Sequence, residues 1–177
     1  MSLPTSGTPR PAIDDDYRLE EQIGFLLRRA HQVATDIFGS QIGAERITPM
    51  QFSALVKLLQ CGEMSQSALG EATAMDPATI LGVVHRLAGR GLLAIRADPG
   101  DGRRRLIQLT RSGAALAKRL RDIGPRISEA TLAGFNARDR KSLLRLLAML
   151  GERKSGCSGR TVAWRCTRAM ASPRNRQ

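Results

Sequence analysis

Apolar residues recur three and four positions apart in several long stretches of the chain, and this spacing is typical of amphipathic helices. The first stretch covers residues 15–39. A second begins at Thr48-Pro49-Met50-Gln51, where a capping hydroxyl, a first-turn proline and a glutamine form a capping box. Further helices are expected over residues 110–132, with a bend or break at Gly124-Pro125, and from Asn136 onward.

The pattern of residues 65–110 differs from that of the long helices and predicts shorter elements. Ser65 is placed to cap a short helix ending near Ala72, and Asp76-Pro77 starts another that runs to Arg90. Two apolar or alternating runs then flank the turn sequence DPGDG, as in a β-hairpin. Helix, turn, helix and hairpin in this order predict a winged helix-turn-helix, so the fold class is mainly α with a small β-hairpin.

The two ends of the chain lack such patterns. Residues 1–13 combine three prolines with Ser, Thr and Gly, a composition expected for a disordered arm. The segment 151–177 is rich in Arg, Ser and Gly and has no helical or strand period. We expect a basic disordered tail there, either a nonspecific DNA-binding tail or an unstructured or translationally altered extension. The folded domain is expected over residues 14–150.

The charge of the chain favours a polyanionic partner. Lys and Arg number 28 against 16 Asp and Glu, which gives a net charge of +12. Aromatic residues make up only 3%, so stacking on single-stranded nucleic acid has little material and duplex DNA is favoured. The N-terminus has no apolar signal region, and Arg145 interrupts the apolar stretch near the C-terminus, so a cytoplasmic protein without membrane contact is expected.

The helix that starts at Pro77 has two distinct faces when its residues are placed 100° apart. Four apolar residues share the face expected to pack inward: Ile80, Val83, Val84 and Leu87. The other face carries small, polar or basic residues expected to meet DNA: Ala78, Thr79, Gly82, His85 and Arg86. Small residues let a helix sit deep in the major groove, and Arg86 can bind a guanine edge or a phosphate. An ordinary solvated helix face is the alternative.

The hairpin and the preceding short helix supply further candidates for DNA contact. Arg103, Arg104 and Arg105 follow the hairpin tip, and strand alternation sends neighbours to opposite faces. Asp101 is placed to hold Arg103 by a charge-assisted bond. At the start of the short helix, three polar residues are expected to clamp a phosphate, although the first also serves as the cap: Ser65, Gln66 and Ser67.

Other chemistry finds little support in the sequence. Cys61, Cys157 and Cys166 lack metal-ligand spacing, and His31 and His85 are far apart, so neither a metal nor a cofactor is expected. No phosphate loop, paired-acid motif or Ser-His-Asp order stands out, so the protein is not expected to be an enzyme. Two alternatives stay open: a thiol-based redox-responsive regulator acting through Cys61, and a winged-helix protein-interaction scaffold without specific DNA binding.

Three segments carry a family resemblance: TPMQF at 48–52, SQSALGEATAMDPATILGVVHRLAGRGLL at 65–93, and DPGDGRRRLIQLTRSG at 98–113. Together they resemble the MarR (multiple antibiotic resistance regulator) family over roughly residues 17–150. The resemblance implies a homodimeric transcriptional regulator that reads a pseudo-palindromic operator in double-stranded DNA. It further implies a DNA-binding head at 46–110 and dimerisation helices at 14–45 and 111–150. One departure is Gly102, at a wing position that is usually basic in the family.

Within that family, YRLEEQIGFLLRRAHQVATDIFG and AMDPATILGVVHRL are similar to repressors of nicotinate catabolism. This similarity implies a repressor released from its operator by a small aromatic carboxylate such as 6-hydroxynicotinate. On the first helix, Phe25 and Arg29 flank one edge of the apolar stripe and His31 the other, so a ring and a cation are available for such an acid. These three residues are therefore the candidates for binding the ligand; the alternative is a structural role, with Arg29 as an ion-pairing surface residue and His31 as a boundary histidine.

Overall fold

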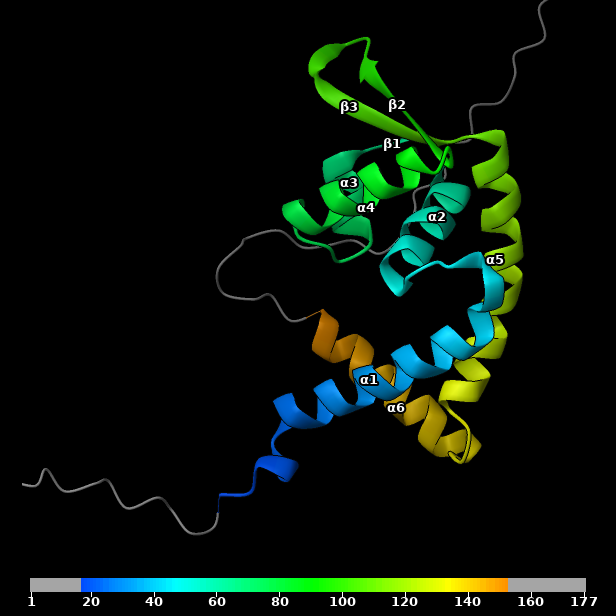
Figure 1. The fold of residues 1–177 in the computed structure, drawn as a ribbon. Coiled ribbons are helices and arrows are strands. Elements are labelled where there is room, and N and C mark those ends of the chain that lie inside the picture. The colour runs from blue at the N-terminus through cyan, green and yellow to red at the C-terminus, as the bar shows by residue number, and fades with distance from the viewer. Residues whose placement is uncertain (1–16, 153–177) are drawn as a thin grey trace, which may run out of the picture.

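The computed structural model describes residues 17–152, apart from the side chains of residues 44 and 102–104. The disordered N-terminal segment predicted for residues 1–13 and nearly all of the basic tail predicted for residues 151–177 lie outside the described residues. The described chain is mainly helical with one small sheet (Figure 1). Its elements are η1 (Leu19–Glu21), α1 (Ile23–Ile42), η2 (Gly43–Glu45), α2 (Pro49–Cys61), β1 (Met64–Ser65), α3 (Gln66–Ala72), α4 (Pro77–Gly89), β2 (Leu93–Asp98), β3 (Asp101–Leu109), α5 (Arg111–Thr131) and α6 (Ala137–Gly151).

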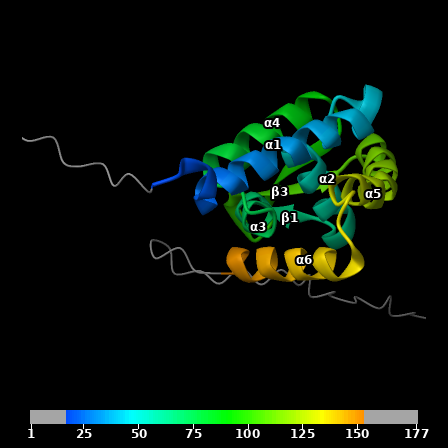
Figure 2. The same cartoon turned by 90° about the horizontal axis from the view of Figure 1, so that it is seen from below.

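The elements form two groups, which we call the head (α2 to β3) and the arm (α1 and α6). The head lies at one end of the molecule with the β2–β3 hairpin at its tip, and the arm lies at the other end (Figure 1). Helix α5 starts beside the head and runs down to the arm. Viewed from below, α1 and α6 lie on opposite sides of the molecule (Figure 2). The mainly helical fold with a hairpin confirms the predicted fold class.

The sheet has three antiparallel strands in the order β1-β3-β2. The β2–β3 hairpin was predicted and forms the wing, with Ile95 paired to Ile107 and a register irregularity at Ala97/Asp98 near the tip. The two-residue strand β1 was not predicted. Ser65 was predicted as a helix cap and a phosphate contact, and its backbone also pairs with Leu106. The wing is therefore tied to the start of α3 through the two residues of β1.

The core lies in the head and extends along the first half of α5. The four residues predicted to face inward from α4 are all buried, with exposed fractions of 0–1%, which confirms that face of the helix. Helix α2 contributes Ala54, Leu55 and Leu58, and α5 contributes Leu116, Ala117 and Leu120. At the lower edge of this core, Phe38 of α1 meets Phe52 of α2 edge-to-face, with ring centroids 5.5 Å apart.

One predicted helix start was wrong, and one predicted helix break is absent. The first helix begins at Ile23 rather than near residue 15, because the chain first forms the separate turn η1. Of the bend or break predicted at Gly124-Pro125, the break is absent, because helix α5 continues through Pro125, and the bend stays a prediction. Proline removes only the hydrogen bond to the carbonyl of Arg121, and its ring lies exposed on the helix surface, so neighbouring contacts hold the helix together.

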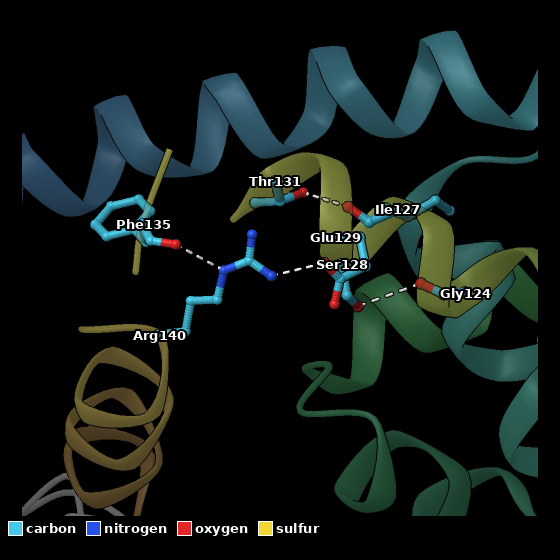
Figure 3. Close-up of polar contacts among 7 residues, drawn as sticks. All are labelled: Gly124, Ile127, Ser128, Glu129, Thr131, Phe135 and Arg140. Carbon is cyan, nitrogen blue, oxygen red and sulfur yellow. Dashed lines mark hydrogen bonds and ion pairs between the residues drawn. The ribbon is translucent and has the colours of Figure 1, made fainter. Parts of the chain in front are cut away.

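The arm leaves a large apolar surface exposed. On α1 this surface includes Ile23, Leu26 and Val33, and on α6 it includes Leu144, Leu147 and Leu150. No residue of α6 is buried. Its first turn is anchored by Arg140, which donates to the Glu129 carboxylate (2.6 Å) and to the carbonyl of Phe135 (2.9 Å; Figure 3). An apolar surface of this kind marks an interaction site. None of the described helices is long and apolar enough to span a membrane.

Candidate nucleic-acid interface

The N-terminus of α4 is fixed by Asp76. Its carboxylate accepts hydrogen bonds from the backbone N–H groups of Ala78 (3.0 Å) and Thr79 (2.9 Å), and from the Thr79 hydroxyl (2.5 Å). The Thr79 hydroxyl contact, followed by its backbone bond, lowers the pKa of Asp76 below its ordinary value of 3.8. The Thr79 hydroxyl thus donates its proton within the protein and presents its lone pairs outward. It can accept from a base amino group.

This cap makes the stability of α4 depend on pH. Because the folded-state pKa of Asp76 is lowered, its contribution is present above the ordinary value of 3.8 and is lost as the pH falls through the lowered pKa. We expect Asp76→Ala to unfold a few degrees below the wild type at neutral pH, and the difference to vanish in strong acid. Thermal unfolding followed by circular dichroism measures this. Asp76→Asn, which keeps an acceptor, is the control, and a difference that does not change with pH would contradict the prediction.

The residues predicted to face DNA from α4 lie away from the core. Ala78, His85 and Arg86 are exposed, and Thr79 and Gly82 are half-buried. Gly82 has a specific use, since a Cβ atom there would lie 3.3 Å from Nη1 of Arg86. The Arg86 guanidinium therefore folds back over Gly82, as expected for a long side chain that leans toward the helix N-terminus. Together these residues present a small, polar and basic surface.

Ser65 caps α3 as predicted, and the phosphate contact predicted for it stays a prediction. It is buried, with an exposed fraction of 6%, and its hydroxyl accepts from the backbone N–H of Ala68 (3.2 Å) and contacts the Ser67 hydroxyl (3.2 Å). Its side chain is thus used as the cap of α3. Gln66 is half-buried and Ser67 is exposed, so these two stay available for a phosphate.

On the wing, only part of the predicted basic cluster can be placed. Arg105 is exposed on β3 and pairs in register with Ala97. The side chains of Arg103 and Arg104 lie outside the described residues, so the bond between Asp101 and Arg103 stays a prediction. The structure adds a contact that sequence reasoning missed: Arg96 binds Glu63 through two bonds of 2.8 and 2.5 Å, which also raise the pKa of Arg96. This pair ties β2 to the loop before β1.

A close backbone contact joins the end of α4 to the start of α5. Gly91 has a left-handed conformation (φ +68°), and its carbonyl accepts from the hydroxyls of Thr110 (2.8 Å) and Ser112 (3.0 Å). Gly113 then lies so near that a Cβ atom would come within 1.9 Å of the Leu92 carbonyl oxygen. The sequence of the TRSG segment does not by itself indicate that Gly113 lies against the Leu92 backbone. Only glycine fits at this junction.

A cleft of about 450 Å³ lies between the head and α5. It is lined by Phe38, Pro49, Phe52, Ser53, Val56, Gln60, Arg121, Gly124, Ile127 and Ser128. The lining is mainly apolar with a few polar groups, and its size is within the range of small-molecule sites. Among the polar groups that line the cleft, the Ser128 hydroxyl donates a hydrogen bond to the carbonyl of Gly124 (3.2 Å; Figure 3).

The three residues predicted to bind a ligand are not brought to this cleft. Arg29 and His31 are exposed on α1, and Phe25 is half-buried with the Arg28 guanidinium 5.7 Å from its ring centroid. None of the three lines the cleft, which instead uses the C-terminal part of α1 together with α2 and α5. Within residues 17–152, no three His, Cys, Asp or Glu side chains lie close enough to hold a metal ion.

Helices α2, α3 and α4 followed by a two-stranded wing define the class of winged helix-turn-helix proteins. A family model, described as the MarR family, matches residues 47–104. The HTH-type transcriptional repressor NicR of Pseudomonas putida is 41% identical over 147 residues, which is 83% of this chain and 93% of that protein. The chain therefore belongs to the MarR family, whose members similar to it are transcriptional regulators.

Solved structures agree with this assignment. A probable transcriptional regulator from Pseudomonas aeruginosa is 44% identical, with a TM-score of 0.71 over 75% of this chain and 99% of that one. Bordetella bronchiseptica BpsR, described in connection with regulation of its DNA binding by 6-hydroxynicotinic acid, is 37% identical. Its TM-score is 0.74 over 78% of this chain and 99% of that one.

Proposed function

We propose that the protein is a homodimeric repressor that occupies a pseudo-palindromic operator and is released by a small aromatic carboxylate of the hydroxynicotinate class. The similarity to NicR and BpsR supports a repressor and this class of effector. The basic, small-residue face of α4 supports reading of the major groove, and the wing supports contact with the DNA backbone. The division into a DNA-binding head and dimerisation helices belongs to the same proposal.

The cleft between α2 and α5 is the observation that carries the effector part. The edge-to-face pair Phe38 and Phe52 offers aromatic surface for a ring. Arg121 offers a guanidinium for a carboxylate, at present directed to Asp122 at 3.0 and 3.1 Å. That pair is more than half exposed and is therefore weak, so a bound carboxylate can replace Asp122 at low cost.

The exposed apolar residues of α1 and α6 support the dimer. A second copy of the chain would cover the surfaces that the arm leaves open, and a two-fold assembly would present two α4 helices to one face of DNA. Two half-sites one helical turn apart are the operator geometry expected for such a dimer.

An electrophoretic mobility shift tests the function as a whole. The probe is a duplex selected by the protein from a random pool, titrated with 6-hydroxynicotinate, nicotinate and benzoate. We expect a discrete complex that 6-hydroxynicotinate dissociates at lower concentration than the other two acids. A complex that none of the acids dissociates would refute the effector, and binding that is equal on random DNA would refute the specific repressor.

Arg121→Ala tests the cleft. We expect the concentration of 6-hydroxynicotinate that releases half of the DNA to rise about tenfold or more, because a charge-assisted bond is lost. DNA affinity without the acid should stay unchanged, since Arg121 lies on the cleft side of α5. Arg126→Ala is the matched control, as it removes one exposed arginine from the same helix outside the cleft lining. An equal rise in both variants would contradict the assignment.

A further inference from the structure

The C-terminal end of α4 is held by an arginine that contacts the segment between α1 and α2. Arg90 is the C-cap residue of this helix. Its guanidinium donates to the backbone carbonyls of Arg46 (3.1 Å, through Nη1) and Glu45 (3.0 Å, through Nη2). These carbonyls belong to the connector that joins α1 to α2, more than forty residues earlier in the chain. The end of α4 is thereby fixed directly to the segment that leaves the arm.

The same connector is held a second time from α5. The Glu45 carboxylate accepts two bonds from Arg119, one from Nε (3.1 Å) and one from Nη2 (2.9 Å). The side chains of Glu45 and Arg119 are 32% and 58% exposed, so water screens this pair only in part. Glu45 therefore connects three elements that lie far apart in sequence: its backbone meets the end of α4, and its side chain meets the middle of α5.

The backbone of this connector does not adopt its conformation by preference. Arg46 is in the left-handed region (φ +48°), which residues other than glycine rarely adopt, and Gly43 also has a positive φ of 58°. A left-handed arginine persists only where surrounding contacts hold it. Arg90 bonds to the Arg46 carbonyl itself, Arg119 holds the side chain of the preceding Glu45, and the next residue, Ile47, is buried in the core.

We infer that Arg90, Glu45 and Arg119 are positioning residues that set the direction of α4 relative to the arm. In the proposed dimer, on which this step rests, that direction fixes the distance between the two α4 helices. It therefore fixes the spacing of the half-sites that the dimer accepts. None of the three needs to touch a base to influence which operator is bound.

Arginine near a DNA-binding surface has a simpler role, which is contact with phosphates, and the two roles predict opposite signs for Glu45. If only charge matters, removing the negative charge of Glu45 strengthens DNA binding. If Glu45 positions the connector, Glu45→Ala weakens binding despite the gain in net positive charge. The sign of this one change separates the two explanations.

The experiment measures affinity by fluorescence anisotropy on three duplexes: the operator selected by the wild type, the same operator with one base pair inserted at its centre, and a single half-site. We expect Glu45→Ala, Arg90→Ala and Arg119→Ala to bind the selected operator about tenfold more weakly and to lose much of the wild type's preference over the shifted duplex. Affinity for the single half-site should change less than twofold. Arg90→Lys, which keeps a donor, should restore part of the preference.

Two controls complete the design. Arg126→Ala removes the same charge from the exposed surface of α5 and should leave the spacing preference intact. Thermal unfolding identifies any variant that has lost its fold; such a variant is left out of the comparison, and Arg90→Lys replaces Arg90→Ala if that is the variant lost. Tighter binding by Glu45→Ala, or variants that keep the wild-type spacing preference, would overturn the inference alone. A wild type without any spacing preference would overturn the proposed dimeric repressor and this inference with it.

Discussion

Gly113→Ala is expected to lower the free energy of unfolding by about 3 kcal/mol or more, at the upper end of the cost of overpacking. The added methyl carbon would lie 1.9 Å from the carbonyl oxygen of Leu92 and 2.9 Å from its carbonyl carbon. Both are backbone atoms, so no side-chain rotation relieves the clash. Relief requires α5 to move away from the end of α4.

The hydrogen bonds at this junction make such movement costly. The Leu92 carbonyl accepts from the backbone N–H of Thr110, and the Thr110 hydroxyl accepts from the N–H of Gly113 while donating to Gly91. Moving α5 would break these bonds together. We therefore expect Gly113→Ala also to weaken DNA binding, since the junction places both α4 and the wing.

Urea unfolding followed by circular dichroism measures this effect. Gly39→Ala is the matched control: Gly39 lies within α1 with nothing near its added Cβ atom, so alanine there should be neutral or stabilising by up to about 1 kcal/mol. A Gly113→Ala protein as stable as the wild type would show that α5 shifts freely, contrary to the close contact described.

Arg86→Ala is expected to reduce affinity for the selected operator by about tenfold to a hundredfold, since one bidentate contact to a base is worth about 1–3 kcal/mol. Arg86 is exposed on the face of α4 opposite the buried residues, and its guanidinium is held over Gly82. A guanidinium in a defined place loses less freedom on binding than a mobile one.

The effect of Arg86→Ala is to be compared with that of Arg105→Ala on the wing. Arg105→Ala should reduce affinity for the operator and for random duplex DNA by a similar factor, as expected for a phosphate contact. Arg86→Ala should act mainly on the operator. Anisotropy titrations on both duplexes measure the two factors. Equal losses on random DNA for both variants would remove the assignment of base reading to Arg86.

Features that depend on neighbouring residues were predicted well from the sequence. The capping box at Thr48 and Gln51 forms with both of its bonds, and Asn136 caps α6. The inward face of α4 follows from helical periodicity alone and is buried as expected. Local hydrogen bonds and the helical repeat determine these features, so a single sequence contains enough information for them.

Features that depend on distant residues were not predicted. Strand β1 has two residues and exists only because β3 pairs with it. In the sequence, nothing distinguishes Arg90 and Arg119 from other surface arginines. Only the fold brings them to Glu45, which lies 45 and 74 positions earlier in the chain. The cleft was not predicted for the same reason, because a ring and a cation on one helix do not show which helices enclose a cleft, and the ligand role of Phe25, Arg29 and His31 stays a prediction. The cleft wall is formed by α1, α2 and α5 together.

The unbroken course of α5 has a mechanical consequence. Gly124, at the cleft, and Arg111, beside the wing, lie on one rigid rod, separated by about 20 Å at 1.5 Å per residue. A tilt of about 5° at the cleft would carry the far end of the rod by about 1.7 Å, and opposite tilts in a two-fold pair would add to about 3.4 Å, one step along a DNA strand. In the proposed dimer, a ligand that tilts α5 slightly would thus move the two α4 helices out of register with the major groove of DNA.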